Sequence, residues 1–356
     1  MNKYPQLDLA RSLAALFVFF NHLRYLSFLG YDKQNLGAAG KAFFFITGFG
    51  HQSVMVFFVL SGFFISKTIV DSIERGKWSP KRYAVHRVTR LWVVFIPALL
   101  LTLLMDTLTE KFFGFNDSEG RHTLINFLRN MFFMQGFHQW PAYGSNIALW
   151  SLANEFWYYV LLPFVLVPIF IPSSRKIAIP VALVVMFGAY WVLRDFFVGI
   201  HGFLIFLMGA LVYCITRKET RKIKTFWFYL GVLFFLIVLT LSRYIDSPPA
   251  LWDMLLGTGV AVMVYTWVMT KDQFSRYYDK YATFFSSFSF TLYVTHVPLM
   301  LFFCSMVGLH NAYVTPMNMV WYCLLAVGNL ALSYGLYWLF ERNTNHVRKY
   351  VESKLL

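Results

Sequence analysis

The chain has 356 residues, of which 58% are hydrophobic, 20% aromatic and only 13% charged. A soluble globular domain carries about 25% charged residues, and it could not bury all of the 40 Phe and 11 Trp found here. The composition therefore excludes a water-soluble fold and predicts an all-α, polytopic integral membrane protein.

About ten apolar runs follow one another along the chain, each close to the roughly 20 residues that a helix needs to cross a bilayer. They lie at 9–29, 51–71, 91–110, 147–170, 177–194, 200–215, 226–243, 251–270, 284–306 and 316–340. The run at 200–215 is short for a complete crossing. We expect one membrane domain over 1–345, followed by a short cytoplasmic tail at 346–356.

The longest stretch between apolar runs is 111–146, which we expect to be an extracytoplasmic loop. It begins with polar residues, and its semi-apolar part at 124–137 is typical of a segment that lies in the membrane interface.

The formal net charge of +14 has two explanations, a nucleic-acid partner or membrane topology. If the runs alternate across the membrane, a minority of the 31 Lys and Arg residues falls on one side, namely Arg24, Lys33, Lys41, Lys111, Arg121, Arg129, Arg194 and Arg243. All the other Lys and Arg fall on the opposite side. Cytoplasmic connections of membrane proteins carry such an excess, so both termini are predicted to be cytoplasmic and no nucleic acid is expected as a partner.

The three cysteines, Cys214, Cys304 and Cys323, all fall inside predicted spans and show no C-x-x-C spacing. Neither a metal site nor a structural disulfide is expected from this pattern.

The first apolar run contains two residues that are costly to place in a bilayer, Arg11 and His22. On a helix they lie about 20° apart around the axis and about 16 Å apart along it, so they share one face, with His22 near mid-membrane. Asp8 lies one turn before Arg11 on nearly the same stripe. The structural alternative is that Arg11 extends to the interface while His22 hydrogen-bonds a neighbouring helix.

Two later spans carry further buried polar groups. Glu155 lies about two turns into the fourth span, at a depth that we expect to be similar to that of His22. His296 lies in the ninth span with Tyr293 one turn away. A hydrogen bond between helices, or for Glu155 a clamp on an arginine, explains these residues as well as a substrate contact does.

Arg87 and Arg90 lie one helical turn apart where the third span begins. The planar guanidinium group binds phosphate in a bidentate manner, although lipid headgroups and topology are the commoner reasons for such residues.

Six short motifs occur in order along the chain. They are Asp8-Leu9-x-Arg11 with His22, the run Val56 to Phe63 around Ser61, Arg87-x-x-Arg90, Trp150-Ser151-Leu152 with Glu155 and Tyr159, Ser289 to Tyr293 with His296 and Pro298, and Glu341-Arg342. Together they resemble the acyltransferase 3 family of integral membrane O-acyltransferases, in the form without an appended esterase-like domain. The sequence departs from the family pattern before the second span, at Gly48 to Ser53, and in the position of Pro97.

The resemblance implies a cytoplasmic acetyl-CoA or other acyl-CoA donor and a saccharide or lipid-linked glycan acceptor, in a protein of the bacterial inner membrane surrounded by lipids. No permanently bound cofactor is expected. Arg11, Arg87 and Arg90 are the expected donor-binding residues, and His22 and Glu155 the catalytic ones. We expect substrate contacts from Asp8, Ser61, Trp150, Tyr293 and His296.

Several alternatives stay open at the level of sequence. His22 acts either as a general base or as an acceptor of the acyl group, and Glu155 either orients His22 or binds sugar hydroxyls. A secondary transporter or flippase, with the buried His and Glu as a proton relay, fits the same composition. The oligomeric state is left unassigned.

Overall fold

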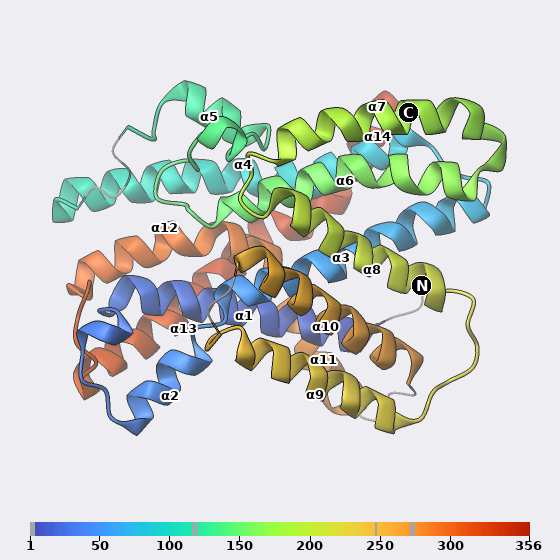
Figure 1. The fold of residues 1–356 in the computed structure, drawn as a ribbon. Helices are drawn as coiled ribbons and strands as arrows, with labels where there is room; N and C mark the ends of the chain where they lie inside the picture. Colours follow the sequence, from blue (N-terminus) through green and yellow to red (C-terminus); the bar gives the residue numbers. More distant parts are fainter. Residues whose placement is uncertain (1–3, 116–117, 119, 246–247, 271–274) are drawn as a thin grey trace.

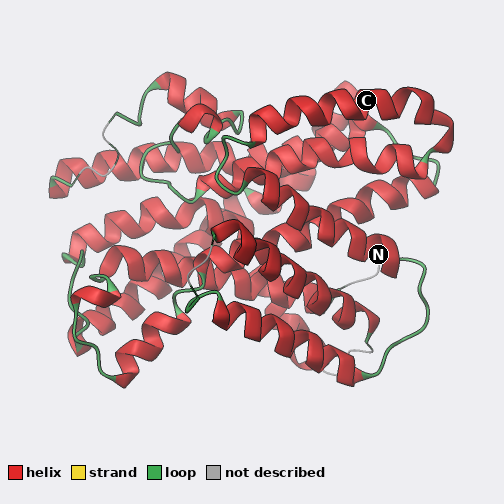
Figure 2. Ribbon diagram, in the orientation of Figure 1, coloured by secondary structure: helices red, strands yellow, loops and turns green. Residues whose placement is uncertain are grey.

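The computed structural model describes residues 4–115, 118, 120–245, 248–270 and 275–356, and these form an assembly of helices (Figures 1 and 2). The helices are α1 (Pro5–Ser27), α2 (Ala38–Ile46), α3 (Gly50–Glu74), α4 (Pro80–Phe113), α5 (Leu124–Met131), α6 (Leu149–Phe170), α7 (Arg175–Leu193), α8 (Gly199–Thr216), α9 (Thr225–Leu241), α10 (Pro249–Met269), α11 (Ser275–Ser287), α12 (Ser289–Val307), α13 (Pro316–Leu339) and α14 (Thr344–Leu355).

Eight helices of the described part are long and apolar enough to cross a membrane, namely α3, α4, α6, α7, α8, α10, α12 and α13. The two other predicted spans correspond to α1, whose polar residues lower its hydropathy, and to α9, which has 17 residues. The prediction of an all-α polytopic membrane protein is confirmed.

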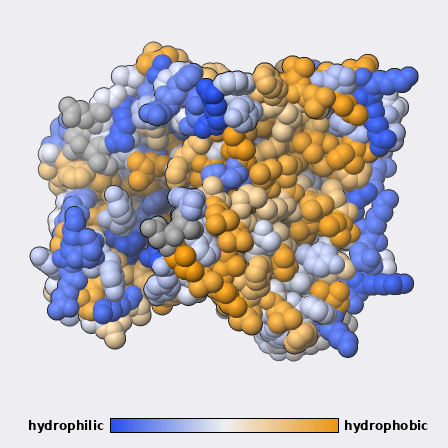
Figure 3. Space-filling view, viewed as in Figure 1, coloured by the Kyte–Doolittle hydropathy of each residue, from blue (hydrophilic) through white to orange (hydrophobic). Residues whose placement is uncertain are grey.

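The surface carries apolar residues that only lipid would cover. Figure 3 shows a broad hydrophobic region over the helices with hydrophilic residues gathered toward both ends of the bundle. In α7 only 6% of the most apolar stretch is buried within the protein, and Leu183 and Phe187 are exposed. Such a helix is stable when the bilayer supplies its apolar environment.

Helices α3 and α8 approach each other closely through glycine. A Cβ atom on Gly62 would lie 1.9 Å from the Phe206 carbonyl oxygen, and one on Gly209 would lie 1.9 Å from the Val59 carbonyl oxygen. Both contacts are shorter than any side chain permits, so the two backbones meet directly, as is common between membrane helices.

Helix α4 begins at Pro80, eleven residues before the predicted start of the third span at 91. Ser79 caps it by accepting a hydrogen bond from the Arg82 N–H, and proline suits the first helical position. Arg87 and Arg90 therefore lie two to three turns inside the helix, after a basic first segment that precedes the apolar run. That they lie at the mouth of the membrane span stays a prediction.

The connection between α4 and α6 folds back into the bundle. Asp106 of α4 accepts hydrogen bonds from the Ser145 N–H at 2.8 Å and the Ser145 hydroxyl at 2.5 Å, and it pairs with His122 at 2.8 Å. Asn146 donates to the Val294 carbonyl of α12 at 2.8 Å. The eight residues of α5 are too few to cross a bilayer. Part of the predicted loop at 111–146, namely 116–117 and 119, lies outside the described residues.

The two ends of the described chain lie at the same end of the bundle. Tyr4 packs edge-on against Phe63 in the later half of α3, and Leu355 accepts a hydrogen bond from Lys81 at the start of α4. The predicted tail at 346–356 is helical: most of it belongs to α14, which packs on α4 and pairs Glu352 with His86 at 2.6 Å.

Candidate active site

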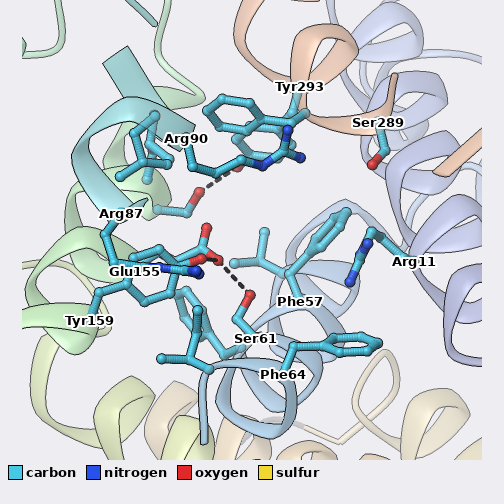
Figure 4. Close-up of a pocket in the computed structure, with 17 residues that line it drawn as sticks. Arg11, Phe57, Ser61, Phe64, Arg87, Arg90, Glu155, Tyr159, Ser289 and Tyr293 are labelled. Atoms are coloured by element: carbon cyan, nitrogen blue, oxygen red, sulfur yellow. Dashed lines mark hydrogen bonds between the residues drawn. The ribbon is translucent and has the colours of Figure 1, made fainter. Parts of the chain in front are cut away.

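Five helices, α1, α3, α4, α6 and α12, surround a cavity of about 180 Å³ (Figure 4). It is lined by residues from five of the six motifs, among them Arg11, Ser61, Arg87, Arg90, Ser151, Glu155, Tyr159 and Tyr293. We call it the arginine cavity. The residues predicted to bind the donor thus share one space with Glu155, although their helices are far apart in sequence.

The three arginines of this cavity differ in the groups beside them. Arg90 pairs with Glu341 at 2.7 Å, and Arg11 lies 3.6 Å from Asp8 and over the ring of Phe64. Among the described residues no carboxylate lies within ion-pair distance of Arg87, and its buried Nε has no hydrogen-bond partner. An anion entering the cavity would find Arg87 available.

Glu341, just after α13, is buried and holds Arg90 in place. Its side chain is only 2% exposed, and it accepts hydrogen bonds from the Thr291 N–H at 3.0 Å and the Thr291 hydroxyl at 2.6 Å. The last of the six motifs therefore connects the end of α13 to α12 and α4, which fixes the position of one arginine.

Glu155 accepts hydrogen bonds from the hydroxyl groups of Ser61 and Tyr159. Figure 4 shows its carboxylate facing the cavity between α3 and α4. The expectation that Glu155 lies at the depth of His22 is wrong, because Ser145 and Asn146 anchor the preceding loop inside the bundle and α6 starts there. Glu155 is consequently level with Arg11 and Ser61, and it has no contact that would orient His22.

Tyr293 closes the cavity toward the centre of the bundle. Its hydroxyl lies 2.5 Å from the Ser151 hydroxyl and 3.2 Å from the Ala148 carbonyl, which accepts a hydrogen bond from it. Its ring packs edge-on against Phe57 at 5.9 Å and lies 5.9 Å from the ring of His296. Tyr293 thus separates the arginine cavity from a second group of polar residues.

That second group is a pair of imidazoles, His22 of α1 and His296 of α12. His22 Nδ1 lies 2.8 Å from His296 Nε2, and His296 Nδ1 lies 2.9 Å from the Leu292 carbonyl. Because a carbonyl only accepts, His296 Nδ1 carries the proton and its Nε2 accepts from His22 Nδ1. We assign the neutral pair this way, which leaves the lone pair of His22 Nε2 unused.

The histidine pair lies at the level of the first turns of α8 and α10. Gly50, at the start of α3, packs against Asn21, the neighbour of His22. The next residue, His51, binds Asp253 and stacks near Trp150, while Asp253 also binds His201. Since His201 and Asp253 lie near the first turns of α8 and α10, His22 is level with the ends of these helices and not with their middle.

His22 is half-buried and lines a small hollow of about 30 Å³ together with Tyr25, Ser145 and Ile147. The long loop after α4 therefore supplies part of the wall beside the histidine, through the same Ser145 that binds Asp106. Motif reasoning did not find this contact, because nothing in the sequence near Asp106 or Ser145 marks them as partners.

The remaining predicted residues take less central positions. Asp8 lies beside Arg11, and Trp150 stacks near His51 and packs against Phe197 at 4.9 Å. Neither residue lines the arginine cavity.

Comparison with known proteins identifies the family. A family model described as an acyltransferase domain matches residues 4–338. A curated Haemophilus influenzae protein, described as uncharacterized, is 31% identical over 119 residues, and the match covers 32% of this chain and 47% of that protein. The chain thus spans about half the length of that relative, and no solved structure matches. Because the family model covers nearly the whole chain, this protein belongs to the acyltransferase 3 family.

Proposed function

We propose that this protein transfers an acyl group, usually acetyl, from a cytoplasmic acyl-CoA to a hydroxyl group of a saccharide or lipid-linked glycan on the other side of the membrane. The observation that carries the proposal is the His22–His296 pair, in which the 2.8 Å contact leaves His22 Nε2 free to accept a proton. A general base needs a lone pair of this kind beside the attacking hydroxyl.

The arginine cavity supports a CoA donor. Arg11 and His22 share one face of α1 and lie eleven residues apart, which is about 16 Å along the helix. Phosphates bound at Arg11, Arg87 and Arg90 would leave the thin pantetheine arm to extend toward the histidine pair. To reach His22 the thioester has to pass Phe57 and Tyr293, which lie between the two groups.

The proposed reaction is a direct transfer. The acceptor hydroxyl attacks the thioester carbonyl carbon while His22 Nε2 takes its proton, and the bond from that carbon to sulfur breaks. The same proton then passes from His22 to the departing CoA sulfur, so the imidazole returns to its neutral form. His296 accepts the hydrogen bond from His22 Nδ1 throughout and stabilises the imidazolium that forms for the duration of the step.

The test replaces His22 by alanine in the host and measures the masses of its surface glycans. We expect wild-type protein to add one acyl group per modified sugar. His22→Ala should lower this by at least about 100-fold, the usual contribution of a positioned general base. His346→Ala is the matched control, because His346 is exposed on α14 outside both polar groups.

Glycan masses that do not change when the gene is deleted would contradict the proposal. A transporter would also show no stabilisation of the purified protein by acetyl-CoA, whereas an acyltransferase should be stabilised by its donor.

A further inference from the structure

A second large cavity, of about 410 Å³, lies at the end of the bundle opposite the arginines, between α3, α9 and α10. Its lining includes His51, Gln52, Arg243, Tyr244, Trp252 and Asp253. We call it the outer cavity. None of these residues belongs to the motifs, and none has a part in the proton transfer described above.

A buried carboxylate organises one wall of the outer cavity. The Asp253 side chain is 3% exposed, and its two oxygens accept from His51 Nε2 at 2.7 Å and from His201 Nε2 at 3.1 Å. Both imidazoles are thereby fixed in one tautomer, with Nε2 as donor and Nδ1 left as an acceptor when the ring is neutral. Fixed imidazoles of this kind present defined hydrogen-bond acceptors beside the cavity.

A second wall of the outer cavity contains Gln52, which has a polar atom without a hydrogen-bond partner. Gln52 is only 9% exposed, and its side-chain oxygen is buried without a hydrogen-bond partner, while its amide nitrogen makes one long contact of 3.4 Å to Ser242. A buried acceptor without a partner costs about 1–3 kcal/mol. That cost is removed if a ligand donates to Gln52.

The rim of the outer cavity is aromatic. Trp252 lines it, and its indole N–H donates to the Ile245 carbonyl at 3.1 Å. Tyr244 is 73% exposed and stacks on Phe45 at 6.2 Å. Flat rings beside fixed hydrogen-bonding groups suit a sugar, whose C–H face packs on an aromatic ring while its hydroxyls donate and accept.

The outer cavity is close to the histidine pair. His51 belongs to its lining and follows Gly50, which packs on Asn21 beside His22. Ser61 of the arginine cavity lies ten residues farther along α3, about 15 Å away. The outer cavity and the hollow beside His22 share no lining residue, so an acceptor that uses both must have several units, one in the outer cavity and another beside His22.

On these grounds we propose that the outer cavity binds a sugar unit of the acceptor other than the one that receives the acyl group. The inference rests on the proposed function, from which it takes the saccharide acceptor. It goes further by assigning specificity to Gln52, Trp252 and the His51–Asp253–His201 cluster. Binding energy gathered at such a remote unit helps to hold the reacting hydroxyl in place.

The experiment uses the full-length protein and, as the probe, host surface polysaccharide from which mild alkali has removed the O-acyl esters. Thermal stabilisation of the purified protein by this polysaccharide is measured for wild type, Trp252→Ala, Gln52→Leu and His22→Ala. We expect both cavity variants to need at least about tenfold more polysaccharide for the same stabilisation. His22→Ala should lose less affinity for the polysaccharide than either cavity variant, although it is inactive. All four proteins should be stabilised equally by acetyl-CoA.

Trp227→Ala is the matched control, because Trp227 is 53% exposed near the start of α9 and lies outside the outer cavity. Wild-type affinity in both cavity variants, or no stabilisation of wild type by the polysaccharide, would overturn the inference. Binding that depends on Trp252 and Gln52 but is not followed by acylation in the host would support the saccharide site and contradict the proposed reaction. Acylation in the host with an unchanged KM for the acceptor in both variants would support the proposed reaction and contradict the saccharide site.

Discussion

The carboxylates beside each arginine determine how much of its charge remains for a ligand. Arg90 is already neutralised by Glu341 at 2.7 Å, whereas Arg87 has no ion pair within the described part of the chain. A guanidinium that lines a cavity without a counter-ion stays in the folded protein at a cost that an anionic ligand offsets. We therefore expect Arg87 to contribute most to the affinity for the donor.

Replacing Arg87 by lysine keeps the charge but loses the planar fork, so the affinity for acetyl-CoA should fall by about tenfold. Stabilisation of the purified protein by acetyl-CoA measures this, with Arg82→Lys, at the exposed start of α4, as the control. Arg90→Lys should instead lower the melting temperature without ligand, because it weakens the contact with Glu341. Equal donor affinity in wild type and Arg87→Lys would show that the phosphates bind elsewhere.

The sequence singled out polar residues inside the bundle but did not predict which of them meet. Arg11, Arg87, Arg90, Ser61 and Glu155 all line one cavity, whereas the sequence placed Glu155 with His22. The partner of His22 is His296, which lies 274 positions away. Such a contact depends on how α1 and α12 are rotated against each other, which the spacing of residues within one helix does not determine.

At the scale of single elements, the glycines of α3 and α8 set how closely two central helices approach. Gly62 and Gly209 each face a backbone carbonyl at a distance that excludes a Cβ atom. The spacing holds Ser61, next to Gly62, against Glu155. Pushing the helices apart would therefore disturb the arginine cavity as well as the packing.

We expect Gly62→Ala and Gly209→Ala each to destabilise the protein by about 1–3 kcal/mol, the usual cost of forcing extra atoms into a packed interface. Thermal unfolding in detergent measures this. Gly188→Ala in α7 is the control, since nothing lies within 4 Å of the added Cβ. Unfolding temperatures that match the control would mean that α3 and α8 separate at little cost.

Helix positions were predicted well where apolarity begins and ends with the helix, and poorly elsewhere. The span predicted at 147–170 corresponds to α6, Leu149–Phe170. Helix α4 begins before its apolar run because its first turns are basic and largely exposed. The depth of Glu155 was misplaced by a loop that re-enters the bundle. Hydropathy marks the lipid-facing part of a helix, so it indicates neither a polar extension of that helix nor a loop that packs inside the protein.

At the scale of the whole molecule, the excess of Lys and Arg on one side predicts that the arginine cavity faces the cytoplasm. After removal of Cys214, Cys304 and Cys323, single cysteines can test this orientation. A cysteine at position 79, between α3 and α4, should be protected from an impermeant thiol reagent in intact cells. One at position 123, exposed in the long loop, should react. The reverse result would place the donor site outside, where acyl-CoA is not found.

The layer formed by Phe57 and Tyr293 has a consequence for the cell that carries this protein. The arginine cavity and the hollow beside His22 have no lining residue in common, so the two polar spaces are separated by aromatic rings. An open, water-filled path between them would conduct protons and collapse the electrochemical gradient across the membrane. Under the proposed function the two rings keep this path closed to water, and the narrow, uncharged pantetheine arm of the donor would fill the gap when it passes between them.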